Sequence, residues 1–188
     1  MRNTEVVTGK VRFSFLNVFT PKASVNNAEP KYSVTLLIPK SDSTTYQKIQ
    51  KAMAAAREAY VARNGAQSMP PKPVHTLYDG DGLRSGGEEF GPECKGCWVI
   101  TVSARADQKP GVYDAFRNDI TDPAEIKSGD YGRAHINFFC YNASGKKGIS
   151  AGLLGVQKLA DGEPFGLVAN SSAFDDGYAD GDDDGFMR

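Results

Sequence analysis

The chain has 188 residues, of which 40% are hydrophobic, and it carries 22 Lys and Arg against 23 Asp and Glu, a formal net charge of −1. This length suits one domain, and a chain of this size buries about 70% of its unfolded surface, which is enough for a core. The near-zero total excludes a uniformly basic nucleic-acid binder and a uniformly acidic protein, but it leaves open a chain with segregated charges.

The charges are segregated along the chain. Residues 175–188 contain six Asp and one Arg, a charge of −5, whereas residues 1–174 carry +4. Within that body, residues 65–93 hold five acidic and two basic side chains, so the rest of the body carries +7. The sequence therefore predicts a basic body with one acidic loop and an acidic tail.

The sequence shows no sign of export or of a membrane anchor. No apolar run approaches the roughly 18 residues that a membrane-spanning helix needs, and residues 1–5 lack the apolar stretch of a signal peptide. Three cysteines make a disulfide framework improbable. We therefore expect a cytoplasmic protein without membrane contact.

The first two predicted elements are strands. Apolar and polar side chains alternate over residues 6–19, where Val11, Phe13 and Phe15 share one face. The same alternation recurs over residues 31–40, and Pro39 limits the far end of that strand.

A helix is predicted directly after the second strand. Apolar residues recur at spacings of three and four from Tyr46 to Tyr60, Ser41 or Ser43 suits the N-cap, and Gly65 suits the position after the last turn. Its apolar stripe either packs on the sheet or binds a partner, and packing on the sheet is the commoner use.

The second half of the chain is again predicted to form strands. Residues 65–93 contain four prolines and six glycines and predict a long loop. Strands are predicted at residues 97–105, 112–113, 131–141 and 146–159, with glycines where a barrel would bend. The fold class is therefore mainly β with one major helix (α+β). We expect an OB-type barrel of five to six strands with a long loop insertion and a disordered tail.

The strand predicted at residues 131–141 has two contrasting faces. The face from Gly132 to Cys140 is small and apolar, which is typical of a core, while the opposite face mixes three aromatic rings with an arginine and a histidine. Bases stack on such rings at about 1–3 kcal/mol each, and cations hold the backbone of nucleic acid. With nearby basic residues, the predicted DNA-binding set is Lys10, Arg12, Arg105, Tyr113, Arg133, Phe139, Tyr141, Lys146 and Lys147, with Arg117 as a further candidate.

The acidic tail contains aromatic residues among its aspartates. A segment of this composition does not fold alone, and it resembles a nucleic-acid strand in charge and in stacking groups. Because it is tethered, it can occupy the basic surface until nucleic acid displaces it, or it can bind a partner; the alternative is a solubilising tail. The residues assigned to this role are Asp180, Asp182, Asp183, Asp184 and Phe186.

Metal sites are weakly indicated. Cys94 and Cys97 have the spacing of half a zinc site, but a structural zinc needs four ligands, and the chain offers only Cys140, His75 and His135 besides. The sequence leaves open whether this pair binds zinc.

A catalytic centre is also weakly indicated. Asp79, Asp81, Glu88 and Glu89 have the chemistry of a two-metal nuclease site, although a Gly- and Pro-rich loop gives such a site little rigid support. The chain has no glycine-rich phosphate loop. We expect no enzyme activity, no cofactor and no metal.

The order of segments resembles the phage-encoded single-stranded DNA-binding proteins that have an OB fold and an acidic, aromatic-bearing tail. The resemblance rests on TGKVRFSF at residues 8–15, on KYSVTLLIPK at residues 31–40 before the helix, on GISAGLLGVQ at residues 148–157 followed by DGE at residues 161–163, and on the tail. It implies sequence-independent binding of single strands and a tail that contacts replication proteins. In such proteins the tail commonly ends on an aromatic residue, whereas Met187 and Arg188 follow Phe186 here.

We therefore predict an OB-fold DNA-binding domain over residues 1–174 and a flexible acidic tail over residues 175–188. The expected function is sequence-independent binding of single-stranded DNA in phage DNA replication or recombination, in the host cytoplasm, by a monomer or dimer. Polymerase and helicase are the replication proteins that such a tail would recruit. Two alternatives stay open: a metal-dependent nuclease or resolvase, and a phage structural β-protein.

Overall fold

The structure is a computed structural model that describes residues 2–23, 29–143 and 145–165. The described residues form strands and one long helix. The strands are β1 (Glu5–Val7), β2 (Val11–Lys22), β3 (Lys31–Pro39), β4 (Val74–His75), β5 (Leu77–Asp79), β6 (Cys97–Arg105), β7 (Gly111–Tyr113), β8 (Tyr131–Ala143) and β9 (Lys146–Ala160). The helices are α1 (Ser43–Asn64) and the 3-10 turns η1 (Ala66–Ser68), η2 (Pro92–Cys94) and η3 (Pro123–Glu125). Within these segments, no helix has both the length and the apolar character needed to cross a bilayer.

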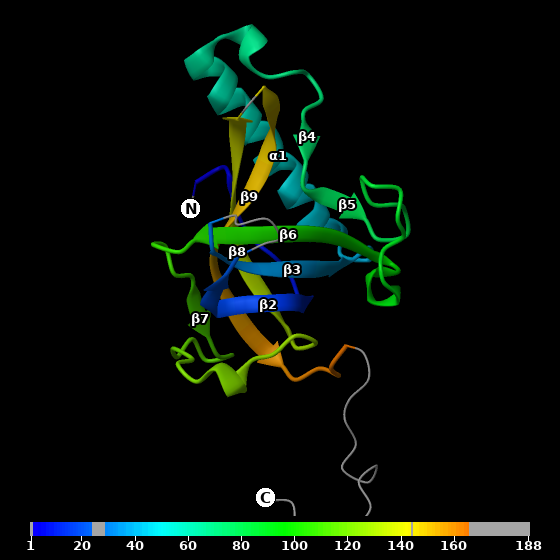
Figure 1. The fold of residues 1–188 in the computed structure, drawn as a ribbon, viewed down its shortest axis with the longest axis vertical. Coiled ribbons are helices and arrows are strands. Elements are labelled where there is room, and N and C mark those ends of the chain that lie inside the picture. The colour runs from blue at the N-terminus through cyan, green and yellow to red at the C-terminus, as the bar shows by residue number, and fades with distance from the viewer. Residues whose placement is uncertain (1, 24–28, 144, 166–188) are drawn as a thin grey trace, which may run out of the picture.

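Five of the strands close into a ring (Figure 1). β2 pairs with β3, β3 with β6, β6 with β9, β9 with β8, and β8 pairs back onto β2. The short strands β1, β4, β5 and β7 extend the edges of β8, β9 and β6. The predicted fold class is confirmed: a mainly β chain with one major helix builds an OB-type barrel.

The first predicted strand divides into β1 and β2. Between them Gly9 passes so close to Asp42 that a Cβ would overlap its carboxylate, and its N–H donates to Thr45 Oγ1 at 2.8 Å. The Thr8 hydroxyl accepts the N–H of Ala134 at 3.0 Å, so the chain is anchored at this step. The alternation of residues 6–19 therefore hides a break that only tertiary contacts explain.

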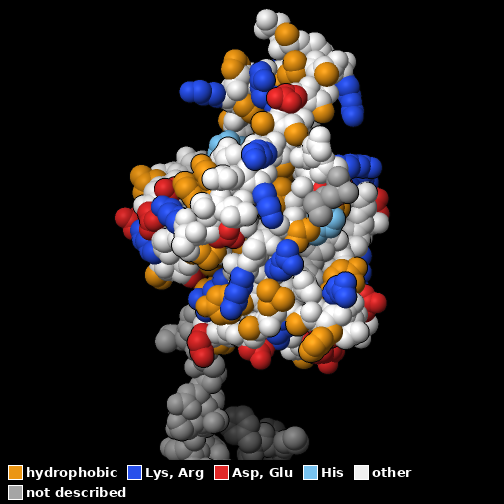
Figure 2. Space-filling model, turned by 180° about the vertical axis from the view of Figure 1, so that it is seen from behind, with side chains coloured by type: hydrophobic (Ala, Val, Ile, Leu, Met, Phe, Trp, Pro, Cys, Tyr) orange, Lys and Arg blue, Asp and Glu red, His pale blue; other side chains and the backbone are white. Residues whose placement is uncertain are grey.

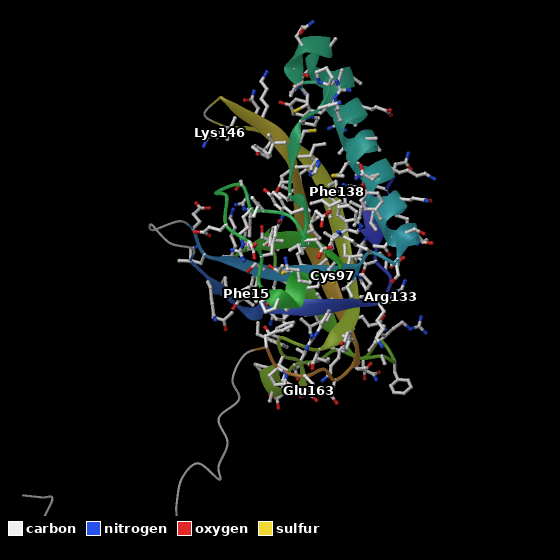
Figure 3. All side chains as sticks on the ribbon, turned by 90° about the vertical axis from the view of Figure 1, so that its right-hand side faces the viewer. Phe15, Cys97, Arg133, Phe138, Lys146 and Glu163 are labelled. Atoms are coloured by element: carbon white, nitrogen blue, oxygen red, sulfur yellow. The ribbon has the colours of Figure 1, made fainter. Side chains whose placement is uncertain are left out.

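Helix α1 packs on the barrel through its small and apolar stripe. Ile49, Ala52, Met53 and Ala56 are buried, and the helix runs along one side of the strands (Figure 3). The packing interpretation of the stripe is therefore confirmed.

The ends of α1 differ from the prediction at one position. The N-cap is Asp42, whose Oδ1 accepts the Thr45 N–H at 2.9 Å, so the prediction of Ser41 or Ser43 was wrong. A carboxylate competes well for this position because it also offsets the positive end of the helix dipole. At the other end Gly65 has φ 92°, as expected of a residue that leaves a helix.

Residues 65–93 are less loop-like than predicted. β4 pairs in parallel with β9, and β5 pairs antiparallel with β6, so residues 65–93 contact the edge of the barrel at two places. Sequence periodicity missed these strands because they have only two and three residues.

The ring closes where β2 meets β8. Gly132 is the partner of Val11, and a Cβ on it would overlap both the buried Phe13 ring and the carbonyl oxygen of Gln157. A larger residue at this position would push β8 away from β2. Closure therefore depends on a residue without a side chain.

A buried carboxylate holds the start of β8. Asp130 is fully buried and accepts the N–H groups of Lys127 and Gly162 at 3.0 and 3.1 Å, while the ammonium groups of Lys127 and Lys158 each lie 3.1 Å from it. Burial alone would raise the pKa of Asp130, but these hydrogen bonds and cations together hold it below its ordinary value. The ionised form thus connects β8 to β9 and to the segment after β9.

We expect Asp130→Asn to lower the free energy of unfolding at pH 7 by about 3 kcal/mol, because the amide leaves the two ammonium groups with only the exposed Asp161 as a carboxylate partner. Since the carboxylate pKa is lower in the folded state, its stabilisation is present above about pH 4 and is lost as the pH falls through the folded value. Urea denaturation from pH 7 to pH 2 should therefore show the two proteins converging in acid. A difference that is zero at pH 7, or constant with pH, would contradict this role.

Candidate nucleic-acid interface

The outer face of β3 and β6 carries a row of paired side chains. Lys31 faces Arg105 at one end, and Leu37 faces Val99 at the other. Between these ends the pairs are small and hydroxyl-bearing: Ser33 with Ser103, and Thr35 with Thr101. We call these four residues the hydroxyl floor. Their short side chains form a shallow depression in the barrel surface between the larger side chains of the pairs at either end.

Three aromatic side chains stand around the apolar end of the hydroxyl floor. Phe15 comes from β2, Tyr78 from β5, and Phe90 from the segment before η2, and together with Arg84 they line a hollow of about 340 Å³ above Thr35 and Thr101. The Tyr78 and Phe90 rings lie 6.2 Å apart, and the Arg84 guanidinium lies 5.1 Å from the Phe90 ring. We call Phe15, Tyr78 and Phe90 the aromatic wall.

Phe15 reaches this hollow because β2 is irregular. The pairing of β2 with β3 shifts register between Ser14 and Asn17, and Phe15 itself has φ 48°. Its ring is 68% exposed, so the prediction that placed it on one face with Val11 and Phe13 was wrong. A non-glycine residue in this backbone region is uncommon and is strained.

The segment of the aromatic wall that carries Tyr78 is attached to the end of β3 by a lysine. Lys40 Nζ lies 2.6 Å from both Asp79 and Asp81, and Asp81 also accepts the Gly96 N–H at 3.0 Å. The hydrogen bonds that Lys40 donates to these carboxylates raise the pKa of Lys40 and lower the pKa of both aspartates. Two of the four carboxylates considered for a nuclease site are therefore engaged with a cation of the chain itself.

Several predicted residues border the other side of the hydroxyl floor. A Cβ at Gly152 would lie 3.6 Å from the Phe139 ring and 3.9 Å from the Ser103 carbonyl, so the half-exposed Phe139 lies beside the floor. Arg105 stands at the basic end, exposed, with Asp107 3.1 Å away.

The tip of the β8–β9 hairpin lies above the same side of the barrel. Lys146 and Phe15 both lie toward the left in Figure 3, and the exposed Lys146 and half-buried Lys147 follow the turn at Gly145. Tyr141 lies against Gly148, where an added Cβ would overlap both the Tyr141 hydroxyl and the Val74 carbonyl oxygen. The structure thus brings Arg105, Phe139, Tyr141 and the two lysines to one side.

Lys10 and Arg12 lie farther along, beyond Glu93, in a neighbouring hollow next to Tyr131. Arg12 donates to the carbonyl oxygens of Gly129 and Glu163 at 3.0 and 2.5 Å, and its guanidinium covers the Phe165 ring at 4.2 Å. The Arg12 guanidinium therefore binds the segment after β9. The Lys10 ammonium is exposed and lies 4.9 Å from the centre of the Tyr131 ring.

Arg133 and Tyr113 are not part of this assembly. Both line a separate hollow over β7, β8 and β9, and Arg133 points to the side opposite Phe15 and Lys146 (Figure 3). The tail residues Asp180, Asp182, Asp183, Asp184 and Phe186 lie outside the described residues.

The cysteine pair is not accompanied by further ligands in the described part of the chain. Cys94 and Cys97 are free thiols, and no group of three or more His, Cys, Asp or Glu side chains gathers there to hold a metal. Burial raises the pKa of both thiols, with Glu93 adding to the effect at Cys94. They are therefore protonated at neutral pH and pack under the aromatic wall beside Leu37 and Val99.

Sequence reasoning missed Phe15, Tyr78, Arg84 and Phe90. Three of them lie in the aperiodic segment 65–93, where neither strand nor helix patterns apply. The signal that was available is the presence of two aromatic residues and an arginine in a stretch rich in Gly, Pro and acidic residues.

Comparisons with known proteins identify relatives of the whole chain. A family model described as Enterobacter phage Enc34, ssDNA-binding protein, matches residues 4–187. The solved single-stranded DNA-binding protein from bacteriophage Enc34 in complex with ssDNA is 28% identical, with a TM-score of 0.74 over 88% of this chain and 91% of that one. Protein p50 of Acyrthosiphon pisum secondary endosymbiont phage 1 is 28% identical over 182 residues, 92% of this chain and 93% of that protein.

A more distant structure shares the fold. The single-stranded DNA binding protein encoded by bacteriophage T7 is 15% identical and covers 98% of both chains with a TM-score of 0.60. Since the Enc34 family model spans nearly the whole sequence, the chain belongs to the family of the Enterobacter phage Enc34 ssDNA-binding protein.

Proposed function

We propose that this protein binds single-stranded DNA without sequence preference and acts in phage DNA replication or recombination. The observation that carries the proposal is the hydroxyl floor between the aromatic wall and Phe139, with Lys31 and Arg105 at its basic end. Aromatic rings stack on any base, and cations follow the phosphates, so this combination is typical of non-specific single-strand binding.

The arrangement favours an unpaired strand over a duplex. Phe15 and Phe139 rise from strands on either side of the floor, and each offers a ring with substantial exposed area. A ring can stack on a base only when that base is unpaired and turned toward the protein. The faces of OB barrels built by the second and third strands, here β3 and β6, are also where oligonucleotides bind in this architecture.

We further propose that the protein is non-catalytic, works as a monomer or dimer in the host cytoplasm, and divides into a DNA-binding domain over residues 1–174 and a tail over residues 175–188. The tail carries −5 of charge and is proposed to compete with DNA or to recruit polymerase and helicase. The family match supports the DNA-binding role and extends through most of the tail.

The two hairpin lysines are expected to contribute phosphate contacts. Lys146→Gln with Lys147→Gln should make the slope of log affinity against log salt shallower by about 1.4, since each phosphate neutralised on a single strand contributes about 0.7. Fluorescence anisotropy of labelled oligo(dT) in a salt series measures this slope. Lys48→Gln with Lys51→Gln is the matched control, because both lysines are exposed and lie in the first half of α1. Equal slopes for the two variants would remove the hairpin from the interface.

Phe15 is expected to stack on a base. Phe15→Gly should weaken oligo(dT) binding by about 1–3 kcal/mol while leaving the thermal midpoint unchanged or raised, because glycine accepts φ 48° without strain. Phe15→Tyr, which keeps the ring, should bind like the wild-type protein. Wild-type affinity in Phe15→Gly would show that Phe15 does not contact DNA.

The competing role of the tail is tested by deletion. The chain ending at residue 174 should bind oligo(dT) more tightly than the full chain at low salt, and the gain should fade as salt screens the aspartates. Titrations of both proteins at two salt concentrations measure this difference. Unchanged affinity at low salt would reduce the tail to a partner-binding or solubilising segment.

A further inference from the structure

The hollow over β7, β8 and β9 is a second candidate binding site, on the side of the barrel away from the aromatic wall. It has a volume of about 310 Å³ and is lined by Tyr113, Arg117, Arg133, His135 and Leu154 among others. Seen from behind, Lys and Arg side chains form a broken line down the middle of the molecule (Figure 2). This side is therefore cationic as well.

The two arginines of this hollow are available to an anion. Neither Arg117 nor Arg133 has a carboxylate within ion-pair distance among the described residues, and no side chain that lines the hollow is acidic. The Nε of Arg133 donates a hydrogen bond to the Thr8 carbonyl oxygen at 3.0 Å, which leaves its two terminal guanidinium nitrogens able to bind an anion. At the edge of the hollow, the Glu5 carboxylate lies 3.4 Å from His135 Nε2.

The loop that presents Arg117 is rigidly built. Asp114 Oδ1 accepts the N–H groups of Phe116 and Asn118, both at 2.8 Å, and the Gln157 side-chain amide donates to the Asp114 carbonyl at 3.1 Å. The Asp114 carboxylate is thus occupied by its own loop and does not neutralise the arginines.

Arg117 occupies a position that suits glycine. Its φ is 72°, and among the described residues it shares a positive φ only with Phe15 and five glycines. Both non-glycine residues are exposed and line hollows, one on each side of the barrel. An arginine is strained in this region, where glycine is not, so the loop presents this guanidinium at a conformational cost.

The outer face of β8 connects the two sides. Phe139 lies beside the hydroxyl floor, Arg133 lines the second hollow, and Asn137 and His135 stand between them on the same face. Six residues of strand span about 20 Å. A strand of DNA that leaves the floor at Phe139 therefore passes the polar side chains of Asn137 and His135, and the largely buried Glu5 carboxylate beside His135, before it reaches the arginines.

We propose that the hollow around Arg117 and Arg133 is a second contact site for the same DNA strand, where the two guanidinium groups hold phosphates and Tyr113 stacks on a base. The proposal rests on the proposed function and deepens it, because it predicts that long strands wrap from the hydroxyl floor across β8. The continuity of this face of β8 with the floor favours DNA over the chain's own acidic tail as the occupant.

The experiment compares Arg117→Gly with wild type in the full chain, using oligo(dT) of about 6 and about 20 nucleotides, near the lower end of OB-fold site sizes and beyond their upper end. We expect affinity for the long strand to fall about tenfold and its salt slope to become shallower by about 0.7. The short strand, which the floor accommodates, should bind unchanged. The thermal midpoint should not fall, since glycine relieves the strain. Arg117→Asn, which also tolerates this backbone, should behave in the same way.

The charge-matched control is Arg63→Gln at the end of α1, which also removes one exposed cation. Long-strand affinity equal to that of the control would overturn the proposal, as would an equal loss for both strand lengths. Tighter DNA binding by Arg117→Gly would also overturn it and would assign the hollow to the acidic tail. The short strand separates failure of this proposal from failure of the proposed function. If the wild-type protein does not bind the short strand, the hydroxyl floor itself is not a DNA site.

Discussion

The barrel closes at a point where β2 and β8 approach so closely that residue 132 has no room for a side chain. The Phe13 ring of β2 and the Gln157 carbonyl oxygen of β9 fill the space where a side chain of residue 132 would lie. Gly132 therefore contacts both strands that flank β8 in the ring. This contact sets the register of β8. A shift by one residue would turn the buried face of that strand outward and bury Arg133 and Phe139 instead. Every proposed contact on β8 depends on this closure.

The strands opposite β8 show how one element serves both the core and the surface. The inward residues of β3 and β6, such as Val34, Leu36, Ile100 and Val102, are fully buried. The outward residues of the same strands are short hydroxyl-bearing side chains in the middle and become basic at one end. Large outward side chains would have strengthened cross-strand packing, but they would also have filled the space above the floor. The surface thus gives up some sheet stability to leave room for a ligand.

Much of the fold could be predicted because most long strands alternate cleanly. The bounds of β3 and β6 agree with the periodicity to within one residue, and the two faces of β8 were assigned correctly from sequence. The site was less accessible. Phe15 reads as a core residue until the register shift in β2 turns it outward, and Tyr78 and Phe90 belong to a segment without periodicity. Arg133 and Tyr113 were chosen correctly as outward residues, but periodicity cannot say on which side of a closed ring an outward residue lies.

The ion pairs of Lys40 with Asp79 and Asp81, which we call the Lys40 clamp, give DNA binding a second dependence on ionic strength. The segment that carries Tyr78 is held to the end of β3 by ion pairs from Lys40 to Asp79 and Asp81, whose side chains are between 32% and 45% exposed. Dissolved ions that screen DNA phosphates also screen this clamp. For a single protein, the slope of log affinity against log salt therefore reflects two effects: the release of counterions from DNA and the loosening of the Tyr78 segment. Only the difference between two proteins with the same clamp counts phosphates alone.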